Sequence, residues 1–217
     1  AVRSAVFSPD GSRVLTSSMD GTGKLWDSSS GECVRTLEGH TNVVRSAEFS
    51  PDGAFVLTAS WDRTAKIWDA DSGECLLTLA GHYHEVRSAA LSPDGKLVLT
   101  ASMDGTVKLW DRIVGQCLVT MAEHKNAVRS AIFSADGALV LTASWDDAAK
   151  LWSTDSGLCL CTLGHDNVVR SAELSPDGSK VLTASEDGTA KIWSVPSGEC
   201  VLILDGHGNE VNSAVFS

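Results

Sequence analysis

The sequence predicts an all-β fold made of one repeated unit, and two regularities support that prediction. A Pro-Asp-Gly turn, once replaced by Ala-Asp-Gly, recurs at steps of 42, 42, 42 and 41 residues. These turns begin at Pro9, Pro51, Pro93, Ala135 and Pro176. A tryptophan keeps the same steps, at Trp26, Trp68, Trp110, Trp152 and Trp193. A period of about 40 to 45 residues with Gly-His and Trp-Asp pairs is typical of propeller blades of four strands.

The unit at residues 43–80 shows how the four strands are predicted. Apolar and β-branched residues favour strands over 44–49 and 55–60, and the Ser-Pro-Asp-Gly between them is a tight turn. A third strand is expected over 65–69, ending on Trp-Asp, and a fourth over 74–79. Short loops that contain Asp and Gly indicate antiparallel hairpins. Each unit is therefore expected to be a four-stranded antiparallel sheet.

Five complete units are expected, with one further strand after them. Their approximate boundaries are 2–38, 43–80, 85–122, 127–163 and 168–205, and the lone first strand of a next unit is 211–216. That last strand repeats the first one, so both would compete for one place in a five-blade ring. We predict an incomplete, curved array with exposed sheet surface at its end, from a parent chain with further blades. The alternative is a closed five-blade ring with a spare strand.

Composition excludes several classes of partner. A net charge of -11 and a pI near 4.8 disfavour nucleic acid or an anionic membrane as the partner. No apolar run is long enough to span a membrane. Five of the six cysteines share one repeat position, so they fall in different blades and are expected to stay reduced, as in an intracellular protein of cytoplasm or nucleus. The cysteines are Cys33, Cys75, Cys117, Cys159, Cys161 and Cys200. No metal-ligand spacing or phosphate-binding loop occurs, and we expect no metal and no cofactor.

The series Gly-His, Ser-Pro-Asp-Gly, Asp-Gly-Thr and Trp-Asp resembles the WD-repeat β-propeller family over essentially the whole chain. Departures are local: Glu123 stands before His124 in place of Gly, and Ser153 and Ser194 replace the Asp after Trp. The resemblance implies a propeller that acts as a non-enzymatic scaffold for protein–protein interaction.

Four of the units also repeat a His, a Ser and an Asp, and the Asp follows the His by 22 positions in each. A Ser-His-Asp hydrolase is one interpretation, but an enzyme rarely needs four equal sites. The resemblance implies a structural network in which Asp orients His, His reaches Ser, and Ser reaches the Trp ring N–H. The four sets are His40, Ser60, Asp62, Trp68; His82, Ser102, Asp104, Trp110; His124, Ser144, Asp146, Trp152; and His165, Ser185, Asp187, Trp193.

One arginine recurs near the start of the first strand of every unit. These residues are Arg3, Arg45, Arg87, Arg129 and Arg170. Because the first strand lies nearest the axis, they are expected to form an arc around the mouth of the channel. Beside the Asp of the second turn stand Met19, Trp61, Met103 and Trp145. Exposed Trp near Arg is typical of a binding hot spot, and Arg grips carboxylate or phosphate with two parallel bonds.

The resulting hypothesis is that this face binds an acidic or phosphorylated peptide or loop of a protein partner. Two interpretations compete with it. In the first, the arginines recur only because the units were copied. In the second, they pair with Glu48, Glu85 or Glu173 nearby. The alternative function is that of an architectural or sensor segment of a larger multidomain regulatory protein.

Overall fold

The computed structural model describes residues 1–217 and contains twenty strands and no helix. The strands form five four-stranded antiparallel sheets, each in sequence order, which we call blades 1 to 5. Blade 1 has β1 (Val2–Phe7), β2 (Arg13–Ser18), β3 (Gly23–Asp27) and β4 (Cys33–Leu37). Blade 2 has β5 (Val44–Phe49), β6 (Phe55–Ser60), β7 (Thr64–Asp69) and β8 (Cys75–Ala80).

The other three blades repeat this order. Blade 3 has β9 (Val86–Leu91), β10 (Leu97–Ser102), β11 (Val107–Asp111) and β12 (Cys117–Met121). Blade 4 has β13 (Val128–Phe133), β14 (Leu139–Ser144), β15 (Ala148–Ser153) and β16 (Cys159–Gly164). Blade 5 has β17 (Val169–Leu174), β18 (Lys180–Ser185), β19 (Ala190–Ser194) and β20 (Cys200–Leu204). The prediction of an all-β fold with five four-stranded units is confirmed.

The turn after the first strand shows how the sequence sets the hairpin. Gly53 adopts a φ of 72°, a conformation that favours glycine, and the Asp52 carboxylate accepts the backbone N–H of Ala54 at 3.0 Å. The turn brings β6 back antiparallel to β5, so that Phe49 faces Val56 in the ladder. Two turns do without glycine: Arg63 and Asp147 hold φ values of 74° and 65° where other blades have Gly.

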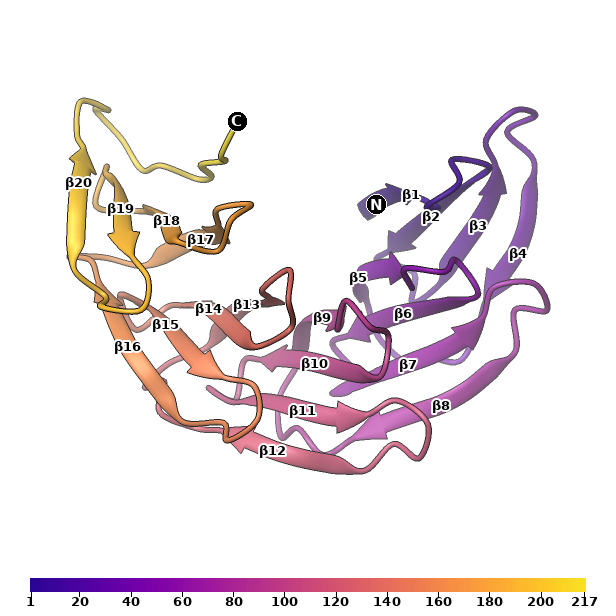
Figure 1. The fold of residues 1–217 in the computed structure, drawn as a ribbon. Helices are drawn as coiled ribbons and strands as arrows, with labels where there is room; N and C mark the ends of the chain where they lie inside the picture. The colour runs from indigo at the N-terminus through magenta and orange to yellow at the C-terminus, as the bar shows by residue number, and fades with distance from the viewer.

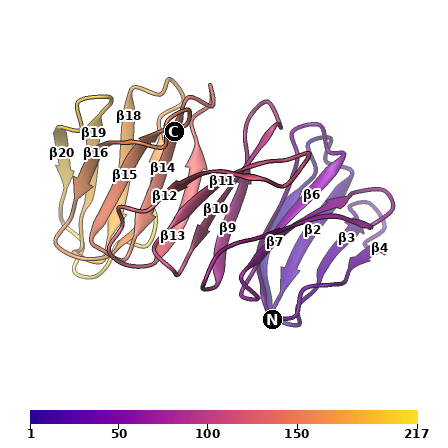
Figure 2. The same ribbon diagram turned by 90° about the horizontal axis from the view of Figure 1, so that it is seen from below.

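The five blades stand face to face in an open arc (Figures 1 and 2). The first strands β1, β5, β9, β13 and β17 line the inside of the arc, and the fourth strands lie on its outer side. Blades 1 and 5 lie on opposite sides of the opening, with the N-terminus at blade 1 and the C-terminus near blade 5. The arrangement is therefore an incomplete ring, as predicted, and not the closed five-blade alternative.

Residues 211–216 do not form the strand that their sequence predicts. The segment has no strand conformation, although it runs beside blade 5. The backbone N–H of Val211 donates to the carbonyl of Ser185 at 2.9 Å, and that of Phe216 donates to the Glu173 carboxylate at 3.2 Å. A strand needs a ladder partner, and no strand of the structure pairs with this segment in a ladder.

The hydrophobic core lies between the blades and not within them. In the junction of blades 2 and 3, Leu57 and Leu79 pack with Val98 and Trp110. Equivalent clusters fill the other three junctions. Each sheet therefore buries its faces only against its neighbours. The outer surface of blade 5 has no such neighbour, and Leu204 keeps 44% of its surface exposed. No helix is present that has the length and apolar character needed to cross a membrane.

Candidate functional site

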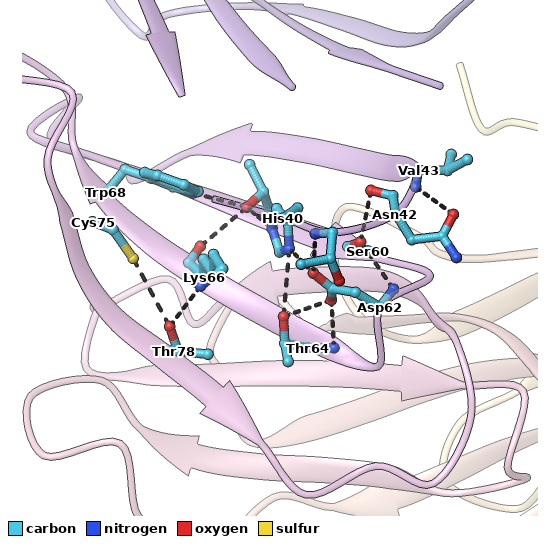
Figure 3. A network of polar contacts seen from close by, with 12 residues as sticks. His40, Asn42, Val43, Ser60, Asp62, Thr64, Lys66, Trp68, Cys75 and Thr78 are labelled. Carbon is cyan, nitrogen blue, oxygen red and sulfur yellow. Dashed lines mark hydrogen bonds and ion pairs between the residues drawn. The ribbon is translucent and has the colours of Figure 1, made fainter. Parts of the chain in front are cut away.

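A chain of hydrogen bonds crosses each of blades 2 to 5, and Figure 3 shows it in blade 2. His40 Nδ1 lies 2.7 Å from a carboxylate oxygen of Asp62. His40 Nε2 lies 2.7 Å from the hydroxyl of Thr58, which accepts the Trp68 ring N–H at 2.8 Å. The His40 side chain is fully buried, so each of its polar atoms is paired inside the protein. We call this chain of Asp, His, Thr and Trp the brace.

The prediction that serine joins His to Trp is wrong. Ser60 donates instead to the carbonyl of Asn42 at 3.2 Å, and its hydroxyl accepts the Asp62 N–H at 3.0 Å. The alternation of a strand places Thr58 and Ser60 on the same face of β6, but only Thr58 reaches the Trp68 ring N–H. The four serines so corrected are Ser60, Ser102, Ser144 and Ser185, and the hydroxyls in the brace belong to Thr58, Thr100, Thr142 and Thr183.

The brace has the same geometry in the other blades. Nδ1 of His82, His124 and His165 lies 2.9, 2.8 and 2.8 Å from Asp104, Asp146 and Asp187. Trp110, Trp152 and Trp193 donate to their threonines at 2.8, 3.0 and 2.8 Å. Blade 1 has the Trp26–Thr16 bond at 2.8 Å, and no histidine of the structure contacts Thr16.

The charges of the brace are set by burial and hydrogen bonds. Burial alone would raise the pKa of Asp62, but bonds from His40 and Thr64 outweigh it and hold that pKa well below its usual range. Burial lowers the pKa of His165, against the opposing effect of Asp187. Ser60 is fully buried and does not contact the His40 ring nitrogen as a catalytic triad requires. This geometry gives no support to the hydrolase interpretation and fits a structural role.

A second repeated feature lies at the start of the inner strands, where every arginine of the arc occupies a β-bulge. In blade 2 the ladder pairs Val44 with Ser60 and then Ser46 with Ala59, so that Arg45 has no partner residue. The same shift occurs at the equivalent arginine of the other four blades. A bulge turns its extra residue out of the ladder and is frequent next to binding sites. The five arginines are therefore placed by one backbone device.

A backbone hydrogen bond holds the residue before the Asp of the second turn close to the arginine of the same blade. The Trp61 N–H donates to the Val43 carbonyl at 3.0 Å, two residues before Arg45. The equivalent bond holds Met19, Met103, Trp145 and Glu186. The guanidinium of Arg3 lies 5.9 Å from the Trp61 ring centre, and that of Arg87 lies 5.3 Å from that of Trp145. Arginines of blades 1 and 3 thus stack on tryptophans of blades 2 and 4, a contact of the cation–π type.

Ion pairs divide the arc into two parts. Arg170 pairs with Glu186 at 2.6 Å and with Glu210 at 3.0 Å. Arg3, Arg45, Arg87 and Arg129 have no carboxylate within 4.0 Å. The glutamates suggested as partners from the sequence are engaged elsewhere. Glu48 accepts the Leu91 N–H, and Glu173 accepts the Phe216 N–H. Glu85 pairs with His84.

The unpaired arginines influence one another. Burial and the charges of Arg45, Arg129, Arg3 and Arg170 lower the pKa of Arg87 to about 10. Burial, followed by the charges of Arg3 and Arg129, lowers the pKa of Arg45. Burial and the charge of Arg170 lower the pKa of Arg129, against the opposing charge of Glu186. The Nε atoms of Arg45 and Arg87 and the Nε1 atom of Trp61 are buried without a hydrogen-bond partner. Buried donors left unpaired are unusual, and these three atoms lie beneath the surface that the outer guanidinium nitrogens form.

The cysteines and acidic side chains form no comparable centre. All six cysteines are free thiols, and burial raises the pKa of Cys159 and Cys161. No group of three or more His, Cys, Asp or Glu side chains is placed to hold a metal ion.

Fold and site together define a β-propeller segment with a brace in four of its blades, and comparison with known families gives the same result. The family model of the WD domain, G-beta repeat, matches five successive stretches that cover most of the chain. The matched residues are 1–27, 31–69, 73–111, 115–153 and 157–194. The chain belongs to the WD-repeat family, whose repeats form protein–protein interaction scaffolds.

Curated relatives match over about one repeat. Human WD repeat-containing protein 86 is 50% identical over 38 residues, which is 18% of this chain and 10% of that protein. Dynein assembly factor with WD repeat domains 1 is 55% identical over 38 residues in both Xenopus laevis and Danio rerio, again 18% of this chain and 9% of each relative. Each match spans about a tenth of the length of the relative.

Proposed function

We propose that the rim formed by Arg3, Arg45, Arg87, Arg129, Trp61 and Trp145 binds an acidic or phosphorylated segment of a protein partner. The observation that carries the proposal is a row of bulged arginines without carboxylate partners on a protein of net charge -11. Ion pairing within the fold accounts for Arg170 but not for the arginines of the other four blades. A scaffold role also agrees with relatives that are named as WD repeat proteins and as a dynein assembly factor. Free cysteines favour an intracellular setting.

Binding would combine charge with a preorganised surface. Arg3 and Arg87 already stack on tryptophans, and Arg87 also contacts the Met103 sulfur at 3.6 Å. Guanidinium groups held in this way lose little freedom on binding, so less of the interaction energy is lost to ordering. An anionic segment gains bidentate bonds from the free edges of the guanidinium groups and contact with the aromatic rings. Met19, which is exposed, extends this surface on blade 1.

The test is a binding titration with a labelled hexapeptide of alternating aspartate and glutamate, followed by fluorescence anisotropy. Arg87→Gln is expected to weaken binding about tenfold, since truncating a hydrogen-bonded charge in an interface costs about 1.4 kcal/mol or more. Arg13→Gln is the matched control. Arg13 lies at the opposite end of its sheet, where it pairs with Asp71 at 2.8 Å.

The melting temperature of each variant shows that it remains folded. Equal affinity of the Arg87→Gln variant and the original protein would reject the proposal. Trp145→Ala provides a second measurement at the same rim, because it removes the ring under Arg87 without changing the charge. We expect it to lower affinity about three- to tenfold, within the range of an interface aromatic.

A further inference from the structure

We infer that the centre of the arginine arc is also a site for a small polyphosphate ligand, which Arg45, Arg87 and Arg129 bind together. The inference goes beyond the peptide-binding role, because its ligand is a compact anion and not a protein segment. It uses the same arginines but needs no contact with Trp61 or with Met19.

The three arginines lie at the starts of neighbouring inner strands. Each arginine projects from a bulge at the same level of an inner strand, and β5, β9 and β13 pack side by side on the inside of the arc (Figure 1). Arg87 is the third of the five arginines in chain order, and its pKa is lowered by burial and by the charges of the other four. Because these three strands are neighbours, one ligand at the mouth of the arc can reach more than one arginine.

The charges of the same three arginines are not paired with any carboxylate of the chain. Arg45, Arg87 and Arg129 lack carboxylate partners, although the chain carries 28 acidic residues. At the blade 5 end, Glu186 and Glu210 neutralise Arg170 and give that side of the rim an acidic border. The site for an anion is therefore limited to blades 2 to 4. Like charges held together in a partly buried place are stabilised most by a ligand with several negative charges.

The same three arginines also have hydrogen-bond donors that a ligand can use. No hydrogen bond or ion pair within the protein uses the guanidinium groups of Arg45 and Arg129, and that of Arg87 donates only to the Met103 sulfur. A phosphate group offers three acceptor oxygens and about 1.5 to 2 negative charges. Several phosphates in one small molecule place these acceptors close together, whereas the carboxylates of an extended chain alternate sides and spread along its length. We therefore expect a compact ligand to engage several of these guanidinium groups at once.

The experiment is calorimetric titration of the whole chain with inorganic triphosphate at pH 7 and 0.1 M salt. We expect one ligand per chain and a loss of affinity of at least tenfold in both Arg87→Gln and Arg129→Gln. Arg13→Gln, the variant at the opposite end of blade 1, is expected to bind like the original protein. Glu186→Gln is expected to tighten binding about threefold, because it removes a negative charge that acts on Arg129 at the border of the site.

Three results would overturn the inference: no heat of binding, several weak ligands per chain, or equal affinities of the arginine variants and the control. Thermal melting of every variant separates loss of binding from loss of fold. The acidic hexapeptide, titrated against the same variants, separates the two roles of the rim. Peptide binding without triphosphate binding rejects this inference alone, and triphosphate binding without peptide binding rejects only the peptide-binding role.

Discussion

Blade 3 and the two end blades are built from nearly the same sequence, yet they differ in what covers them. Blade 3 has a neighbour on each face, and Val98, Leu99 and Trp110 are buried. In blade 5 all five residues of β20 are exposed, and in blade 1 Val2 is 65% exposed. The repeat therefore supplies half of each core, and the adjacent blade supplies the other half. Stability is expected to depend on position in the arc more than on residue type.

The largest expected difference comes from the same leucine position in two blades. Leu79 is 1% exposed and packs between blades 2 and 3, whereas its equivalent Leu204 is 44% exposed at the end of the arc. Leu79→Ala should cost about 2–5 kcal/mol, and Leu204→Ala should cost less than about 1 kcal/mol. Urea unfolding of the two variants measures both values. Equal losses would show that the cores are not shared between blades.

Removal of a brace hydroxyl is the next largest effect. Thr100→Val leaves the buried His82 and Trp110 nitrogens without a partner, and about 2–4 kcal/mol should be lost. Thr16→Val is the matched variant, because blade 1 has only the Trp26 bond and no histidine, so about 1 kcal/mol is expected. If both substitutions cost the same in chemical unfolding, the histidine adds nothing to the brace.

Glu48, at the junction of blades 2 and 3, is expected to make stability depend on pH. Burial raises the pKa of Glu48 to about 7, against an opposing bond from the Leu91 N–H. Its folded pKa exceeds the unfolded value near ~4.3, so its contribution to stability is complete below about pH 4 and is lost as the pH rises through 7.

Glu48→Gln should therefore raise the free energy of unfolding at pH 8 by about 1–3 kcal/mol, with little change at pH 4. Unfolding curves at the two pH values check both statements. A loss of stability in Glu48→Gln at pH 8 would contradict the account.

The smallest expected change in stability comes from a substitution that gives blade 4 a hydrogen bond present in blades 2, 3 and 5. Thr64, Thr106 and Thr189 donate to the brace aspartate, but blade 4 has Ala148 there, and one oxygen of Asp146 is buried without a partner. Ala148→Thr should add about 0.5–1.5 kcal/mol. Asp146→Asn in the same background should cancel the gain. A thermal melt that shows no gain would mean that the new hydroxyl does not reach Asp146.

Most of the fold follows from the sequence, because the period, the turns and the strand pattern recur five times and agree. The brace was predicted in its histidine, aspartate and tryptophan positions but not in its hydroxyl. Thr58 and Ser60 lie on one face of a strand, and spacing alone does not say which of them is level with the Trp68 ring nitrogen. The recurring Leu-Thr-Ala-Ser was the available signal.

Two further features depend on tertiary contacts. The bulge at each arginine arises from a shift in register between neighbouring strands, which the strand sequence does not show. The segment 211–216 has the sequence of a strand but no partner to pair with. That Glu48 bonds to Leu91 rather than to an arginine depends on contacts between blades, so the charge of the rim could not be derived from composition.

The most direct test of the rim as a binding surface is backbone hydrogen exchange with and without the acidic hexapeptide. The account predicts slower exchange at the starts of β5, β9 and β13 and in the turns at Trp61 and Trp145, with no change in the outer strands. Protection confined to the outer strands or to the exposed face of blade 5, or no protection at saturating peptide, would contradict it.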